Sequence, residues 1–133
     1  MGRIVRFSCF ALVIFLVAAC SPQSECSSVV NSAKTCSGTI DTLDGGHNLT
    51  YEVDDLGAPQ SVNLDVTISV GGGRLDVSFR TVDGRTQRGE ARSGSPVRLR
   101  GEVVLNANNE VVISLASNGG AATQVGYTVK LSG

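Results

Sequence analysis

Apolar and polar residues alternate along most of the chain after Ser37, and this pattern constrains the fold more than any other feature. Between Ser61 and Val70 every second residue is apolar: Val62, Leu64, Val66, Ile68 and Val70. Successive side chains of a strand point to opposite faces of a sheet, so such a segment has one buried and one solvated face. Burying these five side chains contributes on the order of 8–12 kcal/mol before conformational entropy is counted. We therefore expect an all-β protein.

The alternation recurs in short segments separated by turns rich in glycine and asparagine. Residues 71–73 are three glycines, and the apolar residues Leu75, Val77 and Phe79 follow, which predicts a hairpin of 61–70 with 74–80. Turn signals at intervals of roughly 8–12 residues, without an amphipathic helix, favour an antiparallel β-sandwich of seven or eight strands with jelly-roll or Greek-key connections. The segment 86–95 has hardly any apolar side chain, and we predict a loop around a short edge strand there.

The N-terminal segment has the form of an export signal. Arg3 and Arg6 precede an apolar run, 7–19, that is interrupted only by Ser8. This run is shorter than the about 20 residues that a transmembrane helix needs. It ends in Val-Ala-Ala-Cys at 17–20, which resembles the lipobox of bacterial lipoproteins. The resemblance implies that a signal helix is cleaved off before Cys20 and that fatty acids such as palmitate anchor the protein through Cys20. The alternative is plain secretion, because Val17 and Ala19 also suit a general signal peptidase.

The number of cysteines agrees with lipidation. Cys9 would leave with the signal peptide, so the mature chain would retain Cys20, Cys26 and Cys36. An odd number is unusual in an exported protein, and acylation of Cys20 leaves Cys26 and Cys36 to form a disulfide. That bridge closes a loop of about ten residues and is worth roughly 2–3 kcal/mol. A redox pair is a weaker alternative, because no Cys-x-x-Cys motif is present.

These observations predict three parts of the chain. Residues 1–19 are the signal peptide, 20–36 a lipid-anchored tether with a disulfide loop, and 37–133 the β-sandwich. Within the loop, 27–35 is expected to be irregular or to form one helical turn. Ser21 follows the modified cysteine, whereas an aspartate there marks retention in the inner membrane in the lipoproteins that the sequence resembles. We therefore expect the outer membrane of the cell envelope, on its periplasmic or surface face, and a membrane contact through the lipid on Cys20.

Composition argues against several functional classes. The net charge is −1 and falls further once the arginines of the signal are removed, so no nucleic-acid partner is expected. The only histidine is His47, and no Gly-x-Ser-x-Gly motif occurs, so we expect neither an enzyme nor a cofactor. Four aspartates could supply oxygen ligands to calcium, but no Asp-x-Asp-x-Asp-Gly loop is present and we predict no metal site. These are Asp41, Asp44, Asp54 and Asp55.

The segment 48–131 also resembles the small β-sandwich of bacterial pre-peptidase C-terminal domains and their carbohydrate-module relatives. Three stretches carry the resemblance: the strand 75–79, the Val-Asp-Gly turn at 82–84 and the closing strand 126–131. The chain departs from that family at 110–113, where Glu-Val-Val-Ile replaces the usual Gly-x-Tyr, and no peptidase precedes the domain. The resemblance implies a β-sandwich with an accessory or binding role.

Charge is distributed unevenly along the chain. Six acidic residues and no lysine or arginine lie between Asp41 and Asp65, whereas seven arginines lie between Arg74 and Arg100. One interpretation is that outward strand positions carry charge for solubility and pair across the sheet. The sharper interpretation is an arginine-rich edge that binds the carboxylates or phosphates of an anionic glycan. Its members would be Arg80, Arg85, Arg88, Arg92, Arg98 and Arg100.

Two functions follow for the mature domain. The first is a lipid-anchored, non-catalytic binding module for an anionic glycan or an envelope protein. The alternative is a structural lipoprotein of an envelope assembly, and an accessory domain of a hydrolase is less favoured.

Overall fold

A computed structural model describes residues 23–29, 33–56 and 60–133. The predicted signal peptide and Cys20 lie outside the described residues. Nine strands and one 3-10 turn, η1 (Asp54–Leu56), make up the described part of the chain. In this part, no helix has both the length and the apolar character needed to cross a membrane.

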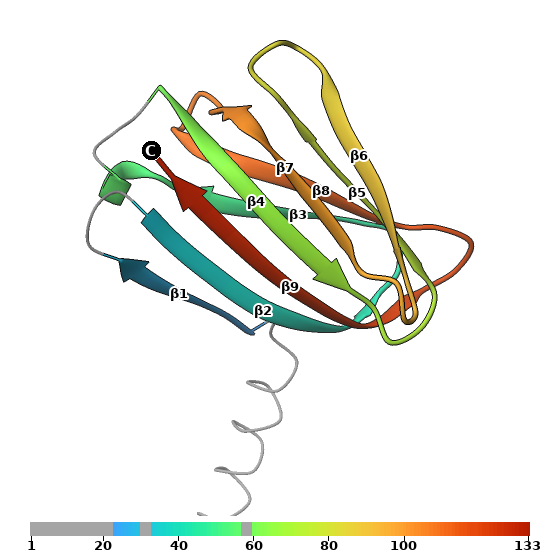
Figure 1. Ribbon diagram of the computed structural model, residues 1–133. Helices are drawn as coiled ribbons and strands as arrows, with labels where there is room; N and C mark the ends of the chain where they lie inside the picture. The colour runs from blue at the N-terminus through green and yellow to red at the C-terminus, as the bar shows by residue number, and fades with distance from the viewer. Residues whose placement is uncertain (1–22, 30–32, 57–59) are drawn as a thin grey trace, which may run out of the picture.

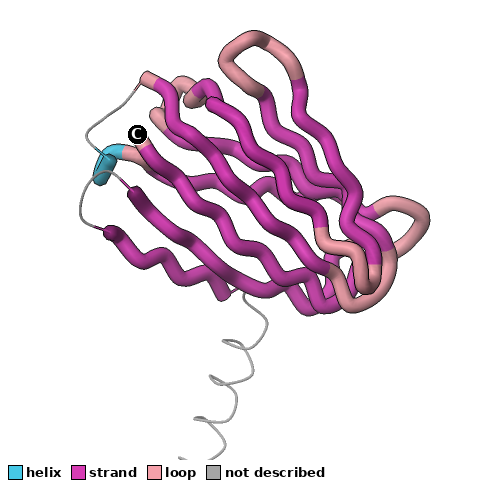
Figure 2. The backbone as a smooth tube through the Cα atoms, in the orientation of Figure 1, coloured by secondary structure: helices cyan, strands magenta, loops and turns pink. Residues whose placement is uncertain are grey.

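The strands form two antiparallel sheets that pack face to face (Figures 1 and 2). Sheet A has five strands in the order β1 (Gln23–Val29), β2 (Ala33–Leu43), β9 (Ala122–Ser132), β4 (Ser61–Ser69) and β7 (Val97–Val104). Sheet B has four strands in the order β3 (Gly46–Glu52), β8 (Glu110–Ser117), β5 (Arg74–Arg80) and β6 (Thr86–Arg92). The predicted antiparallel β-sandwich is therefore confirmed, with more strands than the seven or eight expected.

The alternating segments supply the core between the sheets. Val62, Leu64, Val66 and Ile68 of β4 are all buried, as are Val70 just beyond it and Leu75, Val77 and Phe79 of β5. The opposite faces of both strands are polar and point to solvent. The alternation thus identified the inward face of these strands correctly.

The predicted hairpin of β4 with β5 is wrong. β4 pairs with β7 and β9 in sheet A, whereas β5 pairs with β6 and β8 in sheet B. The glycines between them carry the chain across the end of the sandwich, where the Gly71 N–H donates to the Thr123 carbonyl at 2.9 Å. A Cβ on Gly72 would lie 2.7 Å from the Thr123 hydroxyl, so glycine permits this close passage. Two strands that each bury one face satisfy the same alternation whether they lie in one sheet or in two.

The sandwich also begins earlier than the boundary at 36/37. Residues 27–29 and 33–35 belong to β1 and β2 rather than to a loop or helical turn. The predicted disulfide is present, and it joins Cys26 to Cys36 directly across this strand pair. Cys36 is fully buried, because β2 lies between β1 and β9. The segment assigned to the tether therefore contributes all of β1 and the first four residues of β2 to sheet A.

Strand β6 forms the edge of sheet B where we expected mostly loop. Its Gly89 lies against β7 of the other sheet, since a Cβ there would be 2.4 Å from Val97 Cγ2. The turn before β6 is bonded to β7 as well, because the Val82 N–H donates to the Glu102 carbonyl at 3.0 Å. These contacts join the two sheets along one side of the sandwich. Tertiary contacts of this kind stabilise a strand whose own residues are almost all polar.

Candidate functional site

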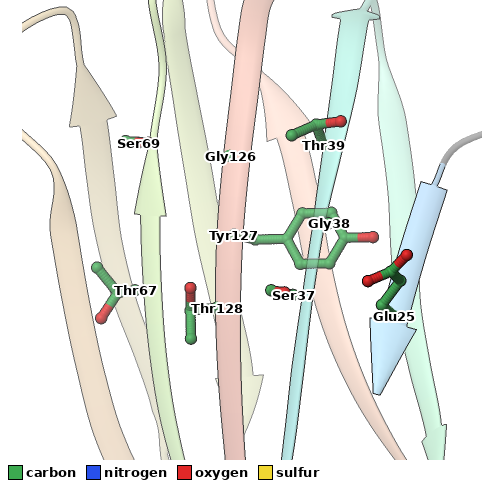
Figure 3. A pocket seen from close by; sticks show the side chains of 9 residues that line it. All are labelled: Glu25, Ser37, Gly38, Thr39, Thr67, Ser69, Gly126, Tyr127 and Thr128. Atoms are coloured by element: carbon green, nitrogen blue, oxygen red, sulfur yellow. The ribbon is translucent and has the colours of Figure 1, made fainter. Parts of the chain in front are cut away.

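The outward face of sheet A carries small hydroxyl side chains in register across its central strands. Thr128 of β9 lies opposite Ser37 of β2 on one side and Thr67 of β4 on the other. One row nearer the end of the sheet, Gly126 lies between Thr39 and Ser69 in the same way. Figure 3 shows both rows across β4, β9 and β2. Neighbouring strands lie about 4.8 Å apart, so the hydroxyls form a regular grid.

These residues line an open groove of about 500 Å³, which we call the hydroxyl groove. Its walls are Glu25, Ser37, Thr39, Thr67, Ser69 and Thr128, with Gly38, Gly126 and Tyr127 below them. Gly126 keeps the groove open at its centre, since a Cβ there would already be 3.1 Å from the Ser69 hydroxyl. Among the described residues that line the groove, Glu25 of β1 is the only charged one.

The described residues that line the groove present no exposed aromatic surface. Tyr127 lies opposite Gly38, and its ring extends from β9 toward that glycine (Figure 3). The residue is only 4% exposed, because the ring belongs to the core. The groove can therefore form hydrogen bonds with a ligand, but it has no ring on which a ligand could stack.

A charged cluster adjoins the groove on the same face. Arg98 Nε donates to Asp65 Oδ1 at 3.0 Å and Arg98 Nη2 to Asp65 Oδ2 at 2.8 Å, while Arg100 Nε lies 3.2 Å from the second oxygen. The hydrogen bond from Arg98, helped by the nearby positive charges, lowers the pKa of Asp65 below its usual range. A second open groove of about 490 Å³ runs past this cluster, between Arg100 of β7 and Lys130 of β9. Arg98 and Arg100 are thus already committed to a carboxylate of their own sheet.

The other predicted arginines lie elsewhere. Arg80 of β5 and Arg88 and Arg92 of β6 point outward from sheet B. Arg92 bonds Glu90 on its own strand, which lowers the pKa of that carboxyl. Arg85 stands in the turn before β6, 3.7 Å from an oxygen of Asp83.

The structure therefore does not bring the six arginines together as one edge. Two lie on the outer face of sheet A, three on the opposite face of the sandwich and one in a turn. Within the described residues, Arg80 and Arg88 form no ion pair. Of the six predicted arginines, these two are without an ion-pair partner among the described residues.

The described residues contain no group of three or more side chains that could hold a metal ion. His47 is exposed on β3.

Sequence reasoning missed the hydroxyl groove. Its signal was present, because serine or threonine stands at alternate positions 37 and 39, and again at 67 and 69. The third strand of the grid comes from the far end of the chain, at 126–128. Nothing in the local pattern shows that these three segments are neighbours.

Comparisons with known proteins do not assign this chain to a family. No family model and no curated protein matches it. A chain of the Bacillus endospore appendages, described as a family of disulfide-linked pili, has a TM-score of 0.45 and 14% identity, covering 84% of this chain and 97% of that one. The CBM22-1 xylan-binding domain from Paenibacillus barcinonensis has a TM-score of 0.39 and 14% identity, covering 84% and 81%. Procruciferin, the 11S globulin of Brassica napus, has a TM-score of 0.39 and 10% identity over 76% of this chain, which spans only 21% of that protein.

Proposed function

We propose that this protein is a lipid-anchored protein of the cell envelope that binds a glycan without acting on it chemically. The hydroxyl groove carries the binding part of the proposal. Its five serine and threonine side chains, on three adjacent strands, can each donate and accept a hydrogen bond. Sugar hydroxyls have the same double character, so a saccharide can satisfy this grid along its length. The groove's volume also lies within the roughly 300–1,000 Å³ of small-molecule sites.

The charge of the groove favours an uncharged sugar. Glu25 is the only charged residue in the described lining of the groove. Its carboxylate repels the acidic groups of an anionic glycan, whereas it accepts hydrogen bonds from neutral hydroxyls. An anionic glycan is the second candidate, and it would bind on sheet B through Arg80 and Arg88. Their lack of any ion pair in the described residues supports that candidate.

The disulfide supports the lipid anchor. With Cys26 bonded to Cys36, Cys20 is the only remaining cysteine of the mature sequence. Acylation of Cys20 would leave the mature sequence without a free thiol, which suits an oxidising compartment. Two or three acyl chains would hold the domain firmly at the membrane. We propose the outer membrane, on the ground of Ser21. The alternative remains a structural lipoprotein that packs into an envelope assembly.

A glycan pulldown tests the binding function. The mature chain with Cys20→Ser is soluble under this proposal and is applied to immobilised neutral and anionic polysaccharides at low and high salt. The double variant Thr67→Val/Thr128→Val removes two central hydroxyls while it keeps side-chain shape. Its matched control is Thr50→Val, the same change on an outward position of sheet B. The variant Arg80→Ser/Arg88→Ser tests the second candidate.

The expected result is retention on a neutral polysaccharide that is insensitive to salt. The Thr67/Thr128 variant should lose this retention and the Thr50 control should keep it. Loss only in the Arg80/Arg88 variant, with strong salt dependence, would favour the anionic glycan. If the protein without the groove or arginine substitutions is not retained even at low salt, the structural lipoprotein is the function that remains.

A further inference from the structure

The hydroxyl groove lies very close to the predicted lipid anchor along the chain. Strand β1 begins at Gln23, three positions after Cys20. An extended chain spans at most about 3.6 Å per residue, so the Cα atoms of Cys20 and Gln23 are at most about 11 Å apart. Glu25 of the groove is two residues further along β1, which adds about 7 Å. This limit of about 18 Å holds for any tilt of the domain on the membrane.

The groove also occupies the half of sheet A that is nearer to this anchor. Its first row, with Thr39, Gly126 and Ser69, is level with Gln23 in the register of the sheet, and its second row is level with Glu25. In Figure 1, β1 starts on the side of the sandwich where β4 ends and β9 begins. The headgroup layer of a bilayer is roughly 5–8 Å thick on each side. If Cys20 carries the lipid, Glu25 at one side of the groove is therefore held within about 18 Å of the anchor, close to the lipid headgroups.

The turns at this end of the sandwich would allow close approach to the membrane. They are 44–45, 70–73, 93–96 and 118–121, and together they contain seven glycines and a single charged residue, Asp44. A Cβ on Gly45, Gly94 or Gly119 would meet nothing within 4 Å. These glycines therefore place exposed backbone, without side chains, in the turns. Long charged side chains that would hold the domain away from the bilayer are missing from these four turns.

We propose that the hydroxyl groove binds the sugar headgroup of a glycolipid in the same membrane that holds the protein's own anchor. This inference rests on the proposed lipid anchor and on glycan binding by the groove. The groove meets such sugars at the level where they leave the bilayer. The two acyl anchors, of the protein and of the glycolipid, confine both partners to one surface, so weak hydrogen bonds suffice for occupancy.

Cross-linking in vesicles tests the proposal with the full lipidated protein. The protein is reconstituted in phosphatidylethanolamine and phosphatidylglycerol vesicles that contain a diglycosyl diacylglycerol with a photoactivatable group on its sugar. We expect cross-links on β2, β9 or β4 that fall to background in Thr67→Val/Thr128→Val and persist in Thr50→Val. A flexible Gly/Ser insert of about 20 residues after Ser21 should lower the cross-link yield roughly threefold, because the glycolipid diffuses in the membrane plane and the contact is diluted only by the height of the groove above the membrane, which grows with about the square root of tether length.

The soluble Cys20→Ser form separates this inference from the proposed function. If the groove retains a neutral polysaccharide in the pulldown but the lipidated protein gives no Thr67- and Thr128-dependent cross-link, the membrane ligand is overturned and glycan binding stands. A cross-link yield that the insert leaves unchanged also overturns it, since closeness to the anchor would then be irrelevant. If neither the pulldown nor the cross-linking detects binding, the proposed glycan-binding function is itself wrong.

Discussion

Cys26 of β1 lies directly opposite Cys36 of β2, with 4.0 Å between their Cα atoms. The disulfide therefore fastens an edge strand that pairs with β2 and with no other strand of the described residues. Close Cα atoms are typical of the non-hydrogen-bonded positions of an antiparallel pair. The bond thus holds β1, which follows the proposed anchor in the chain, onto the sandwich.

Removing this bridge should loosen β1. Because the closed loop has about ten residues, the variant Cys26→Ser/Cys36→Ala should lose roughly 2–3 kcal/mol of unfolding free energy in a urea titration. Amide exchange should become faster in β1 before it does so in β4. The unmutated protein under reducing conditions is the control and should show the same loss. Equal stability of the oxidised and reduced forms would contradict the prediction.

The contact between the edges of the two sheets should depend on Gly89. An alanine there would place its Cβ 2.4 Å from Val97 Cγ2 and 3.2 Å from Leu99 Cδ2. We expect Gly89→Ala to lower the free energy of unfolding by about 1–3 kcal/mol. Gly46→Ala is the matched control, because its Cβ would meet nothing closer than 3.9 Å. The cost of Gly89→Ala should shrink in a Val97→Ala background, and a cost that stays the same there would argue against this contact.

The hydroxyl of Tyr51 should be dispensable for stability. It is buried and has no hydrogen-bond partner among the described residues, and burial raises the pKa of this phenol well above its usual value. An unsatisfied buried polar group costs free energy, so Tyr51→Phe should raise the stability by up to about 1 kcal/mol. Tyr51→Ala should instead lower it by about 3–5 kcal/mol, since the ring belongs to the core. A thermal melt that shows Tyr51→Phe to be destabilising would reveal a partner for the hydroxyl.

Asp65 should make the stability of the fold depend on pH. Its pKa is lowered in the folded state, mainly by the hydrogen bond from Arg98. A carboxyl whose pKa is lowered on folding stabilises the protein fully when the pH is above the unfolded-state pKa of about 3.9. This stabilisation is lost as the pH falls through the folded-state pKa. Asp65→Asn should therefore lower the Tm at pH 7, and the Tm difference should become smaller at pH 2, below the unfolded-state pKa. Asp76→Asn is the control, because Asp76 is at an outward position and forms no ion pair with any residue that the structure describes; it should leave the Tm unchanged at both pH values. An equal loss at both pH values would mean that the charge of Asp65 is not involved.

The mature protein should begin at Cys20 and carry diacylglycerol. Intact mass spectrometry of the membrane fraction measures both features at once. Cys20→Ser should release the protein from the membrane or stall its processing, because the sulfur is the site of acylation in the lipoproteins that the sequence resembles. Ser21→Ala, which keeps the cysteine, should leave the mass of the lipid unchanged. A soluble form with an unmodified Cys20 would instead indicate plain secretion.

The sequence alone determined the inward faces of β4 and β5 and the pairing of two cysteines. Both are short-range properties. A two-residue period shows which side chains of β4 and β5 are buried, because a strand has only two faces. The disulfide followed from the number of cysteines, although the strand pair that it joins was mistaken for a loop. The residues of β1 are mostly polar and therefore show no apolar alternation that would predict a strand. This strand is stabilised by its pairing with β2.

Only the tertiary structure decided which strands are neighbours. Alternation is the same for a strand in either sheet, so β4 and β5 were wrongly joined in a hairpin. The same limit applies to the candidate sites. Arg92 and Arg98 are close in the chain, but the turn between β6 and β7 carries them to opposite faces of the sandwich. Thr67 and Thr128 are far apart in the chain, and the pairing of β4 with β9 places them side by side. Backbone hydrogen bonds between distant segments set that register, and no local pattern contains them.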